Sequence, residues 1–249
     1  MLYWDLGALY GSQNIRTGDS PLDRRARRTN FPFRALRYWH AGCLIAEEAR
    51  RHEREVTVID FGCKRGTQKD VIDDPGNIRW VGLDWKLNAE SLQDQGYAEV
   101  HQSDFDKPLP LADGSGDIAV SLHVFEHLPR PDFSLAEIRR VLKPGGLVII
   151  GTPILPLPAA IIRNRQFKEM HRTGKKVLGK HIQAFSPGRW KRLLREGGVE
   201  LEDCFGSHFY RQSGSPLENK EWWVRLNQLW GILLPGLGRD FIIVGRKKG

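Results

Sequence analysis

Apolar and polar residues alternate along the middle of the chain in blocks that predict strands and helices in turn. The apolar, β-branched run that begins at Val56 ends in a carboxylate and a glycine turn, which is typical of a buried strand in a parallel sheet. Similar runs predict strands at 78–83, 98–102, 117–121 and 146–151, and helical spacing predicts helices at 67–72, 89–95 and 133–142. This alternation predicts an α/β fold with a mostly parallel sheet and helices on both faces.

Both flanks of this alternating region are less regular. Residues 1–30 show no periodicity, and apolar spacing predicts a helix over 31–54 beside the first strand. After 151 come a proline-rich and then basic stretch, a helix at 187–196, a strand at 199–205, an aromatic stretch and a last strand at 240–245. We therefore expect an N-terminal helical cap over 1–55 and one domain over 56–249 with insertions at about 152–184 and 206–238.

Composition agrees with a single α/β domain and a small cap. The chain has 249 residues, of which 40% are hydrophobic, and its three cysteines form no Cys-x-x-Cys pair, which favours a reducing cytoplasmic setting. The first residues lack the basic and apolar regions of a signal peptide. The longest apolar stretch, 147–162, contains three prolines and is a poor candidate for a transmembrane helix.

The formal net charge of +8 comes partly from arginines between 24 and 37 and partly from the basic segment 163–180. Basic patches attract nucleic acid, phospholipid headgroups or phosphorylated substrates. A solvated basic face with no specific partner explains the same charge equally well.

The glycine turn after the first strand is the strongest local signal for a ligand. Gly62 and Gly66 let the backbone turn sharply and approach a bound molecule, and the segment that follows would aim amide donors at the same place. The spacing predicts a nucleotide or nucleoside pocket. It is not the full Gly-x-Gly-x-x-Gly dinucleotide fingerprint, and a tight turn without a ligand remains the alternative.

Acidic and aromatic residues follow the next two predicted strands. Asp84 stands at the tip of the second strand, where a carboxylate accepts both hydroxyls of a ribose, and Trp85 is placed to cover an adenine face. Asp104 follows the third strand, where it can accept an exocyclic amine hydrogen, and Phe105 can pack on the base. The plainer alternative for each aspartate is a turn or helix cap.

Five motifs then follow one another in the central region. They are Val-Ile-Asp-Phe-Gly-Cys-Lys-Arg-Gly at 58–66, Val-Gly-Leu-Asp at 81–84, Ser-Asp-Phe-Asp-Lys-Pro-Leu-Pro-Leu-Ala-Asp at 103–113, Asp-Ile-Ala-Val-Ser-Leu-His-Val-Phe-Glu-His-Leu at 117–128 and Ile-Arg-Arg-Val-Leu-Lys-Pro-Gly-Gly at 138–146. In this order they resemble the class I S-adenosylmethionine-dependent methyltransferases, within the broad branch that includes the ubiquinone-biosynthesis type. The resemblance is strong over 56–153 and weak as far as 199.

This resemblance implies a Rossmann-like sheet with an antiparallel last strand, S-adenosylmethionine as cofactor, and methyl transfer to a small or lipid-like acceptor by in-line displacement. The loop after the first strand would lie beneath the methionine part of the cofactor, and the tip of the fourth strand would approach its amino acid end through the backbone. The cofactor-binding positions implied are Asp60, Gly62, Cys63, Lys64, Gly66, Asp84, Trp85, Asp104, Phe105, Ser121 and Leu122.

One position departs from the family pattern Asp-x-Gly-x-Gly-x-Gly. Lys64 stands where the middle glycine is expected, and a side chain there costs conformational freedom if the site needs a positive φ. Because of this departure, a methyltransferase-like binding protein without catalytic activity remains an alternative interpretation. A nicotinamide oxidoreductase is disfavoured because the dinucleotide fingerprint is missing.

Three histidines are candidates for a general base, since a neutral imidazole is available near pH 7. They are His127, His123 and His181. The run from His123 to His127 also matches the zinc-peptidase pattern His-x-x-Glu-His, but it starts directly after a strand and prolines follow at once, so the helical context is absent and no metal is expected. A structural role in the histidine's own loop is the alternative for each.

Two apolar, proline-broken segments, 154–162 and 222–237, fall where this class of fold places acceptor-binding decorations, and basic residues adjoin the first. An apolar wall beside a cationic rim suits an amphipathic acceptor with an acidic head, or peripheral contact with an anionic membrane surface. A small satellite core is the structural alternative, and an RNA acceptor is the other functional one.

Overall fold

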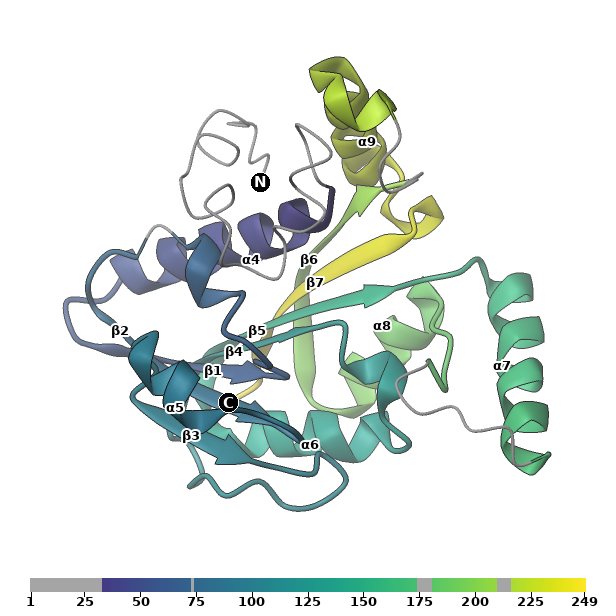
Figure 1. Cartoon of the computed structure of the whole chain (residues 1–249). Helices are drawn as coiled ribbons and strands as arrows, with labels where there is room; N and C mark the ends of the chain where they lie inside the picture. Colours follow the sequence, from purple (N-terminus) through teal and green to yellow (C-terminus); the bar gives the residue numbers. More distant parts are fainter. Residues whose placement is uncertain (1–32, 73, 174–180, 210–215) are drawn as a thin grey trace.

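A seven-stranded sheet forms the centre of the part of the chain that the computed structural model describes, which is residues 33–72, 74–173, 181–209 and 216–249 (Figure 1). The strands are β1 Val56–Phe61, β2 Ile78–Asp84, β3 Glu99–Gln102, β4 Gly116–Leu122, β5 Leu142–Pro153, β6 Val199–His208 and β7 Asp240–Lys247. They lie in the order β3-β2-β1-β4-β5-β7-β6. All strands predicted from the apolar runs are present.

The pairing of the strands confirms the predicted mixed sheet. β1, β2, β3, β4 and β5 pair in parallel, and β7 runs antiparallel to both of its neighbours, β5 and β6. In the register of β5 with β7, Pro153 stands opposite Asp240. The carboxyl ends of the parallel strands and the start of β7 therefore meet at one edge of the sheet, which is where ligands bind in this class of fold.

Helices cover both faces of the sheet. They are α4 Phe33–Arg50, α5 Ala89–Asp94, α6 Pro131–Val141, α7 Leu157–Arg172, α8 Pro187–Glu196 and α9 Glu221–Leu233, with 3-10 turns η1 Lys69–Val71, η2 Phe125–His127, η3 Pro216–Asn219 and η4 Pro235–Leu237. The helix predicted at 187–196 is α8, and the Oγ of Ser186 caps it by accepting from the amide of Arg189 at 3.3 Å.

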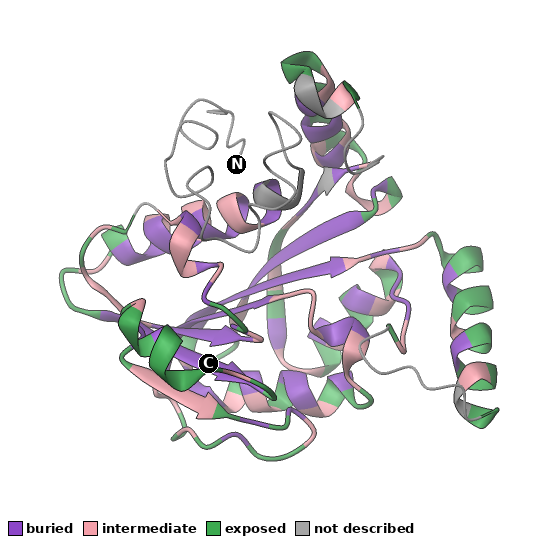
Figure 2. Cartoon of the chain, in the orientation of Figure 1, coloured by how far each residue is buried: buried purple, intermediate pink, exposed green. Residues whose placement is uncertain are grey.

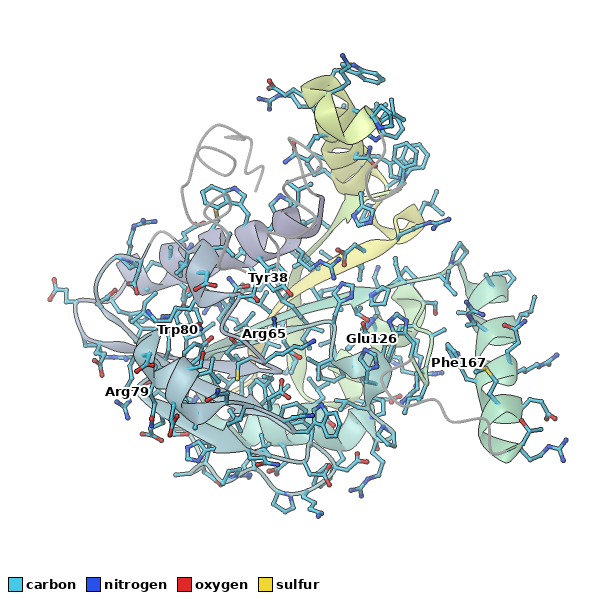
Figure 3. The ribbon with its side chains drawn as sticks, viewed as in Figure 1. Tyr38, Arg65, Arg79, Trp80, Glu126 and Phe167 are labelled. Atoms are coloured by element: carbon cyan, nitrogen blue, oxygen red, sulfur yellow. The ribbon has the colours of Figure 1, made fainter. Side chains whose placement is uncertain are left out.

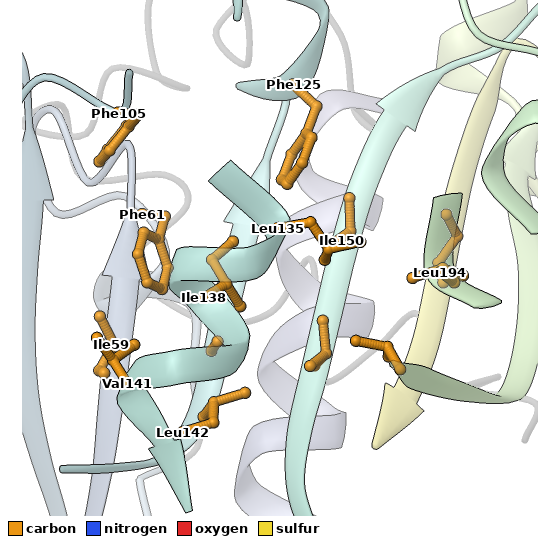
Figure 4. Close-up of a cluster of buried hydrophobic side chains, with 14 of the residues drawn as sticks. Ile59, Phe61, Phe105, Phe125, Leu135, Ile138, Val141, Leu142, Ile150 and Leu194 are labelled. Carbon is orange, nitrogen blue, oxygen red and sulfur yellow. The ribbon is translucent and has the colours of Figure 1, made fainter. Parts of the chain in front are cut away.

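Two apolar clusters hold the layers together. On one face, α6 and α8 contribute Leu135, Ile138 and Leu194, which pack with Ile59 and Ile150 of the sheet (Figure 4). On the other face, α4 and α5 pack against β1 and β2 through Ala41, Ile45, Ala49, Leu92, Val56, Val58 and Trp80. The interior strand segments are buried, whereas α7 and α9 keep one face exposed (Figure 2). Full burial of each Leu or Ile contributes roughly 1.5–3 kcal/mol.

Three elements differ from the prediction. The helix expected over 67–72 is only the single turn η1, because Ile72 is already extended at φ −100° and ψ 142°. The stretches expected to be irregular contain α7 and α9. Pro158 in α7 indicated a break, yet it lies in the first turn, where an amide has no partner within the helix and its loss costs little.

Some predictions fall outside the described residues. These concern most of the N-terminal cap, the arginines at 24–28, and the part of the basic insertion at 174–180. Within the described part, α4 packs on the sheet against β1 and β2. No helix of the described residues combines the length and apolar character needed to cross a membrane.

Candidate functional site

A broad cavity opens at the edge where β1, β2 and β4 end. Its volume is about 1720 Å³, beyond the roughly 300–1,000 Å³ of a typical small-molecule pocket, so it has room for two molecules together. The predicted site residues that line it are Asp60, Gly62, Cys63, Lys64, Asp84, Trp85, Asp104, Phe105, Leu122, His123, His127 and His181. The fold therefore brings together most of the positions that the sequence singled out.

In the loop after β1, every second residue from 62 to 66 has a positive φ. Gly62, Lys64 and Gly66 have φ of 81°, 48° and 72°. A Cβ on Gly62 would lie 2.3 Å from Cγ2 of Val124, and one on Gly66 would lie 2.1 Å from Oε1 of Gln95. The glycine pattern is thus required by both conformation and space, and Lys64 does occupy the left-handed conformation that the family fills with glycine.

Asp84 is the acidic centre of the cofactor side of the cavity. It is 6% exposed, and its oxygens accept hydrogen bonds from the amides of Lys64 and Lys86, each at 3.0 Å. Burial raises the pKa of this carboxyl, and the amide donors partly oppose the shift. Each oxygen keeps a second acceptor position, which is what a ribose diol requires.

A second buried carboxylate, Asp60, lies at the end of β1. The hydroxyl of Tyr97 donates to its Oδ2 at 2.7 Å. Burial raises the pKa of Asp60 to about 7, and the Tyr97 hydrogen bond acts in the opposite direction. Tyr97 was not among the sequence candidates because nothing in the local pattern links it to a residue 37 positions earlier.

The residues expected to contact adenine differ in how exposed their side chains are. Trp85 is 67% exposed at the cavity, and Asp104 is solvated and pairs with Lys107 at 3.6 Å. Phe105 is 8% exposed, because much of its ring packs in the core 6.0 Å from the ring of Phe61. Only the edge of the Phe105 ring that reaches the cavity is available to contact adenine.

Of the two cofactor-binding positions predicted at the tip of β4, only one lines the cavity. Leu122 lines the cavity, but Ser121 does not, since it is 1% exposed and paired within the sheet to Phe61 and Ile150. Gly66 also lies behind the cavity wall and acts by shaping the turn. Conversely, the sequence missed Arg37, Tyr38 and Gln68, which line the cavity from α4 and the segment before η1. Figure 3 labels Tyr38 beside α4.

His123 is held in a buried charge network at the far end of the cavity. Its Nε2 lies 2.9 Å from Oδ1 of Asp240, and Nε of Arg37 lies 3.3 Å from the other oxygen of that carboxylate. Burial lowers the pKa of His123, but Asp240 and Glu126 outweigh this and the net shift is upward. His123 also has a φ of 58°, a strained conformation that the surrounding contacts maintain.

The other two histidines meet beside a buried carboxylate. The rings of His127 and His181 lie 5.0 Å apart, edge to face, and Nε2 of His181 lies 3.7 Å from Oε1 of Glu126. Burial lowers the pKa of His181, with Glu126 opposing the shift. The amides of Ile182 and Gln183 donate to the backbone oxygen of Glu126 at 2.9 and 3.2 Å, which fixes the segment carrying His181 against η2.

Replacing Lys64 by glycine tests the departure from the glycine pattern. A non-glycine residue in the left-handed region costs of order 1–3 kcal/mol, offset in part by the extra unfolded-state freedom of glycine, so we expect Lys64→Gly to stabilise the fold by about 1 kcal/mol in a thermal or denaturant melt. Affinity for S-adenosylmethionine, measured by calorimetry, should hold or improve.

Lys64→Ala is the matched control, because it removes the ammonium group but keeps the strained backbone. If both variants bind the cofactor more weakly, the Lys64 ammonium contacts the ligand or its acceptor and the departure is a specialised one. If only Lys64→Gly changes stability and neither weakens binding, Lys64 is a tolerated residue of the turn.

Comparison with known proteins agrees with this geometry. Residues 59–150 match the family described as "Methyltransferase domain". The chain is 30% identical over 152 residues to a probable S-adenosylmethionine-dependent methyltransferase of Mycolicibacterium smegmatis, covering 60% of this chain and 54% of that protein. It is 57% identical over 97 residues to an uncharacterised methyltransferase of Mycobacterium bovis, covering 38% of each.

A solved structure extends the likeness to the whole fold. A putative methyltransferase from Haloferax volcanii, in complex with the Trm112 activator, superposes with a TM-score of 0.57 at 20% identity and covers 91% of this chain and 95% of that chain. The chain spans only about a third to just over half of the length of the curated relatives it matches. Residues 59–150 therefore carry a methyltransferase domain, and the sheet order and the glycine turn with Asp84 agree with a class I S-adenosylmethionine-dependent methyltransferase.

Proposed function

We propose that the protein transfers a methyl group from S-adenosylmethionine to an oxygen or nitrogen of a lipid-like acceptor. The observation that carries this proposal is the continuity of one cavity, which joins the turn around Asp84 to the cluster of Glu126, His127 and His181. The first end has the groups that a nucleoside needs, and the second has groups that can take a proton.

The residues at the first end fit the cofactor that the family implies. The loop from Gly62 to Arg65 lines the cavity, and the missing side chain of Gly62 leaves its backbone accessible there. Asp84 offers two carboxylate oxygens for ribose hydroxyls, and Gln68 lines the same cavity, its amide nitrogen fixed by donation to the backbone oxygen of Tyr38 at 3.1 Å. Trp85, Asp104 and the exposed edge of Phe105 would hold the adenine.

In the proposed reaction the acceptor atom forms a bond to the methyl carbon while the bond from that carbon to sulfur breaks. The bonding electron pair passes to sulfur, so the positively charged sulfonium becomes a neutral thioether, and the acceptor gives up one proton. Alignment of the three atoms supplies most of the acceleration. His127 and His181 are better placed than His123 to accept the proton, since two carboxylates around His123 favour its imidazolium form.

The lipid-like character of the acceptor is inferred from two helices at the site edge. Trp222, Leu226, Leu229 and Leu233 form one exposed stripe along α9, at helical spacing. Exposed Leu157, Ile161 and Ile162 lie on α7, and its exposed cations are Arg163, Arg165, Lys168 and Arg172. Because α7 follows β5 and α9 precedes β7, both helices belong to the edge that carries the cavity.

Sedimentation with lipid vesicles tests this acceptor class. We expect the protein to bind vesicles with anionic headgroups and to bind neutral vesicles more weakly, because apolar insertion and attraction of about 1 kcal/mol per basic residue act together. Replacing Leu226 and Leu233 by serine should reduce vesicle binding while leaving the melting temperature nearly unchanged, since both side chains are exposed.

The matched control is replacement of Leu92 on α5 by alanine, which should lower stability but not the vesicle affinity of the folded protein, because this side chain is buried away from α7 and α9. An RNA-binding assay at the same salt concentration runs beside it. Salt-sensitive binding to RNA with no binding to anionic vesicles would contradict the proposal of a lipid-like acceptor and indicate a nucleic acid acceptor.

Calorimetric titration with S-adenosylmethionine, with NADH as the comparison ligand, tests the reaction class before any acceptor is known. Binding of S-adenosylmethionine and not of NADH is the expected result. Binding of neither by the folded protein would favour the inactive binding-protein alternative.

A further inference from the structure

We propose that Glu126, His127 and His181 form a binding site for a divalent transition metal ion at the acceptor end of the cavity. One ligand atom from each of these side chains lies within 4.8 Å of the other two, and no other group of three or more such side chains meets this condition within residues 33–72, 74–173, 181–209 and 216–249. The glutamate and the two histidines come from η2 and from the segment after 180.

The spacing of the three groups is close to that of a metal centre. In a tetrahedral zinc site, with bonds of about 2.0–2.2 Å, neighbouring ligand atoms lie about 3.3–3.5 Å apart. The distance from Oε1 of Glu126 to Nε2 of His181 is already 3.7 Å. The rings of His127 and His181 lie edge to face at 5.0 Å, and their ligand nitrogens lie within 4.8 Å of each other, close enough to converge on one ion.

The state of Glu126 is the second, independent indication. The residue is 1% exposed, yet neither carboxylate oxygen accepts a well-aligned hydrogen bond from the described residues. Oε1 lies 3.2 Å from Nδ1 of His123 and 3.7 Å from Nε2 of His181. The ion pair with His123 compensates part of the cost of burying this charge, but Oε2 accepts no hydrogen bond within the described residues, and a cation between the ligand atoms would supply the remaining compensation.

The backbone around the cluster is fixed without the ion. Two amides, from Ile182 and Gln183, donate to the backbone oxygen of Glu126, and the amide of His127 donates to the oxygen of Val124 at 2.9 Å. His123, held on its other side by Asp240, lies against the Glu126 carboxylate and acts as a positioning residue for it. The ligand atoms are therefore presented by two segments that are already anchored to each other.

The donor set selects the kind of ion. Two imidazoles and one carboxylate suit Zn²⁺, Co²⁺, Mn²⁺ or Fe²⁺, whereas Mg²⁺ and Ca²⁺ prefer oxygen ligands alone. Three protein ligands also leave a coordination position open, as in catalytic zinc sites. Resting on the proposed function, this position would face the acceptor, and the ion would lower the pKa of an acceptor hydroxyl, whose proton would then pass to bulk water because both imidazoles are held as ligands.

The test is titration of the full chain with Co²⁺ and then Zn²⁺, without cofactor or acceptor. We expect one equivalent of Co²⁺ to bind with the visible absorption of a low-coordinate site, and Zn²⁺ to displace it. Glu126→Gln, His127→Ala and His181→Ala should each weaken binding by at least about 10–100-fold, the loss caused even by outer-sphere changes at metal sites. Excess Mg²⁺ should not displace Co²⁺.

His52→Ala is the matched control, because Nε2 of His52 lies 3.7 Å from Oε1 of Glu48, the same separation as in the proposed site. This variant should bind Co²⁺ as the parent does. Unaltered binding by all three ligand variants, a thiolate charge-transfer band, or absence of the visible band would each overturn the site. The titration contains no S-adenosylmethionine, so it measures metal binding independently of cofactor binding. A negative result would therefore contradict the metal site and not the proposed methyltransferase activity.

Discussion

Replacing Asp84 by alanine is expected to weaken S-adenosylmethionine binding by about 1.5–3 kcal/mol, the scale of hydrogen bonds to a charged group, which corresponds to roughly 10–150-fold in the dissociation constant. The carboxylate is buried at the tip of β2 and fixed by the amides of Lys64 and Lys86. It would therefore meet the ribose without first losing side-chain freedom, and its loss also removes the acceptor that holds the Lys64 amide of the glycine turn. Calorimetry on the folded variant measures the effect.

Asp104→Ala provides the matched comparison. Asp104 also lines the cavity, but it is solvated and paired with Lys107. Replacing it should therefore reduce the affinity for S-adenosylmethionine less than replacing Asp84 does. Circular dichroism establishes that both variants are folded. Cofactor affinity that is unchanged in folded Asp84→Ala would remove Asp84 from the ribose site, and an equal loss in the two variants would mean that burial does not matter there.

Gly62→Ala is expected to destabilise the fold by about 2–5 kcal/mol. The left-handed conformation at φ 81° costs a side chain about 1–2 kcal/mol, and a Cβ placed 2.3 Å from Cγ2 of Val124 adds an overpacking cost of about 1–3 kcal/mol. The amide of Gly62 also donates to the oxygen of Leu83 at 2.7 Å, which ties the turn to β2. Denaturant unfolding measures the change in the free energy of unfolding.

Gly76→Ala separates the two contributions. Gly76 has a similar φ of 87° but nothing lies within 4 Å of the Cβ that alanine would add, so only the conformational cost of about 1–2 kcal/mol should appear. Val124→Ala combined with Gly62→Ala should recover part of the lost stability in a double-mutant cycle. Equal destabilisation by Gly62→Ala and Gly76→Ala would show that crowding by Val124 is unimportant.

Much of the cofactor side could be predicted because its signals are local. The run from Val56 to the glycine turn fixes a buried strand and its sharp exit within eleven residues, and Asp84 is placed by the end of the next apolar run. The glycine pattern raised the question whether position 64 needs a positive φ, and the structure answers it with a φ of 48° at Lys64. Each inference needs only strand periodicity, turn chemistry and the rule that parallel strands end at one edge.

The predictions that differed from the structure involve competing local signals. Pro158 indicated a break but stands in the first turn of α7. Phe105 does line the cavity, but most of its ring packs in the core, and the side chain of Ser121, which was expected to act only through its backbone, is buried within the sheet. Sequence position tells which edge a residue reaches, but side-chain direction depends on the packing of the neighbouring elements.

By itself, the sequence determined the strand order in the chain, the glycine turn, Asp84 and the family, because residues close in sequence specify these features. Only the tertiary structure decided which groups share the acceptor end. It joins His123 to Asp240 and Glu126 to His181, pairs separated by 117 and 55 positions in the chain. No periodic pattern encodes such contacts, since they arise where β7 runs antiparallel beside β5 and where two backbone amides fasten the segment after 180 to the turn after β4.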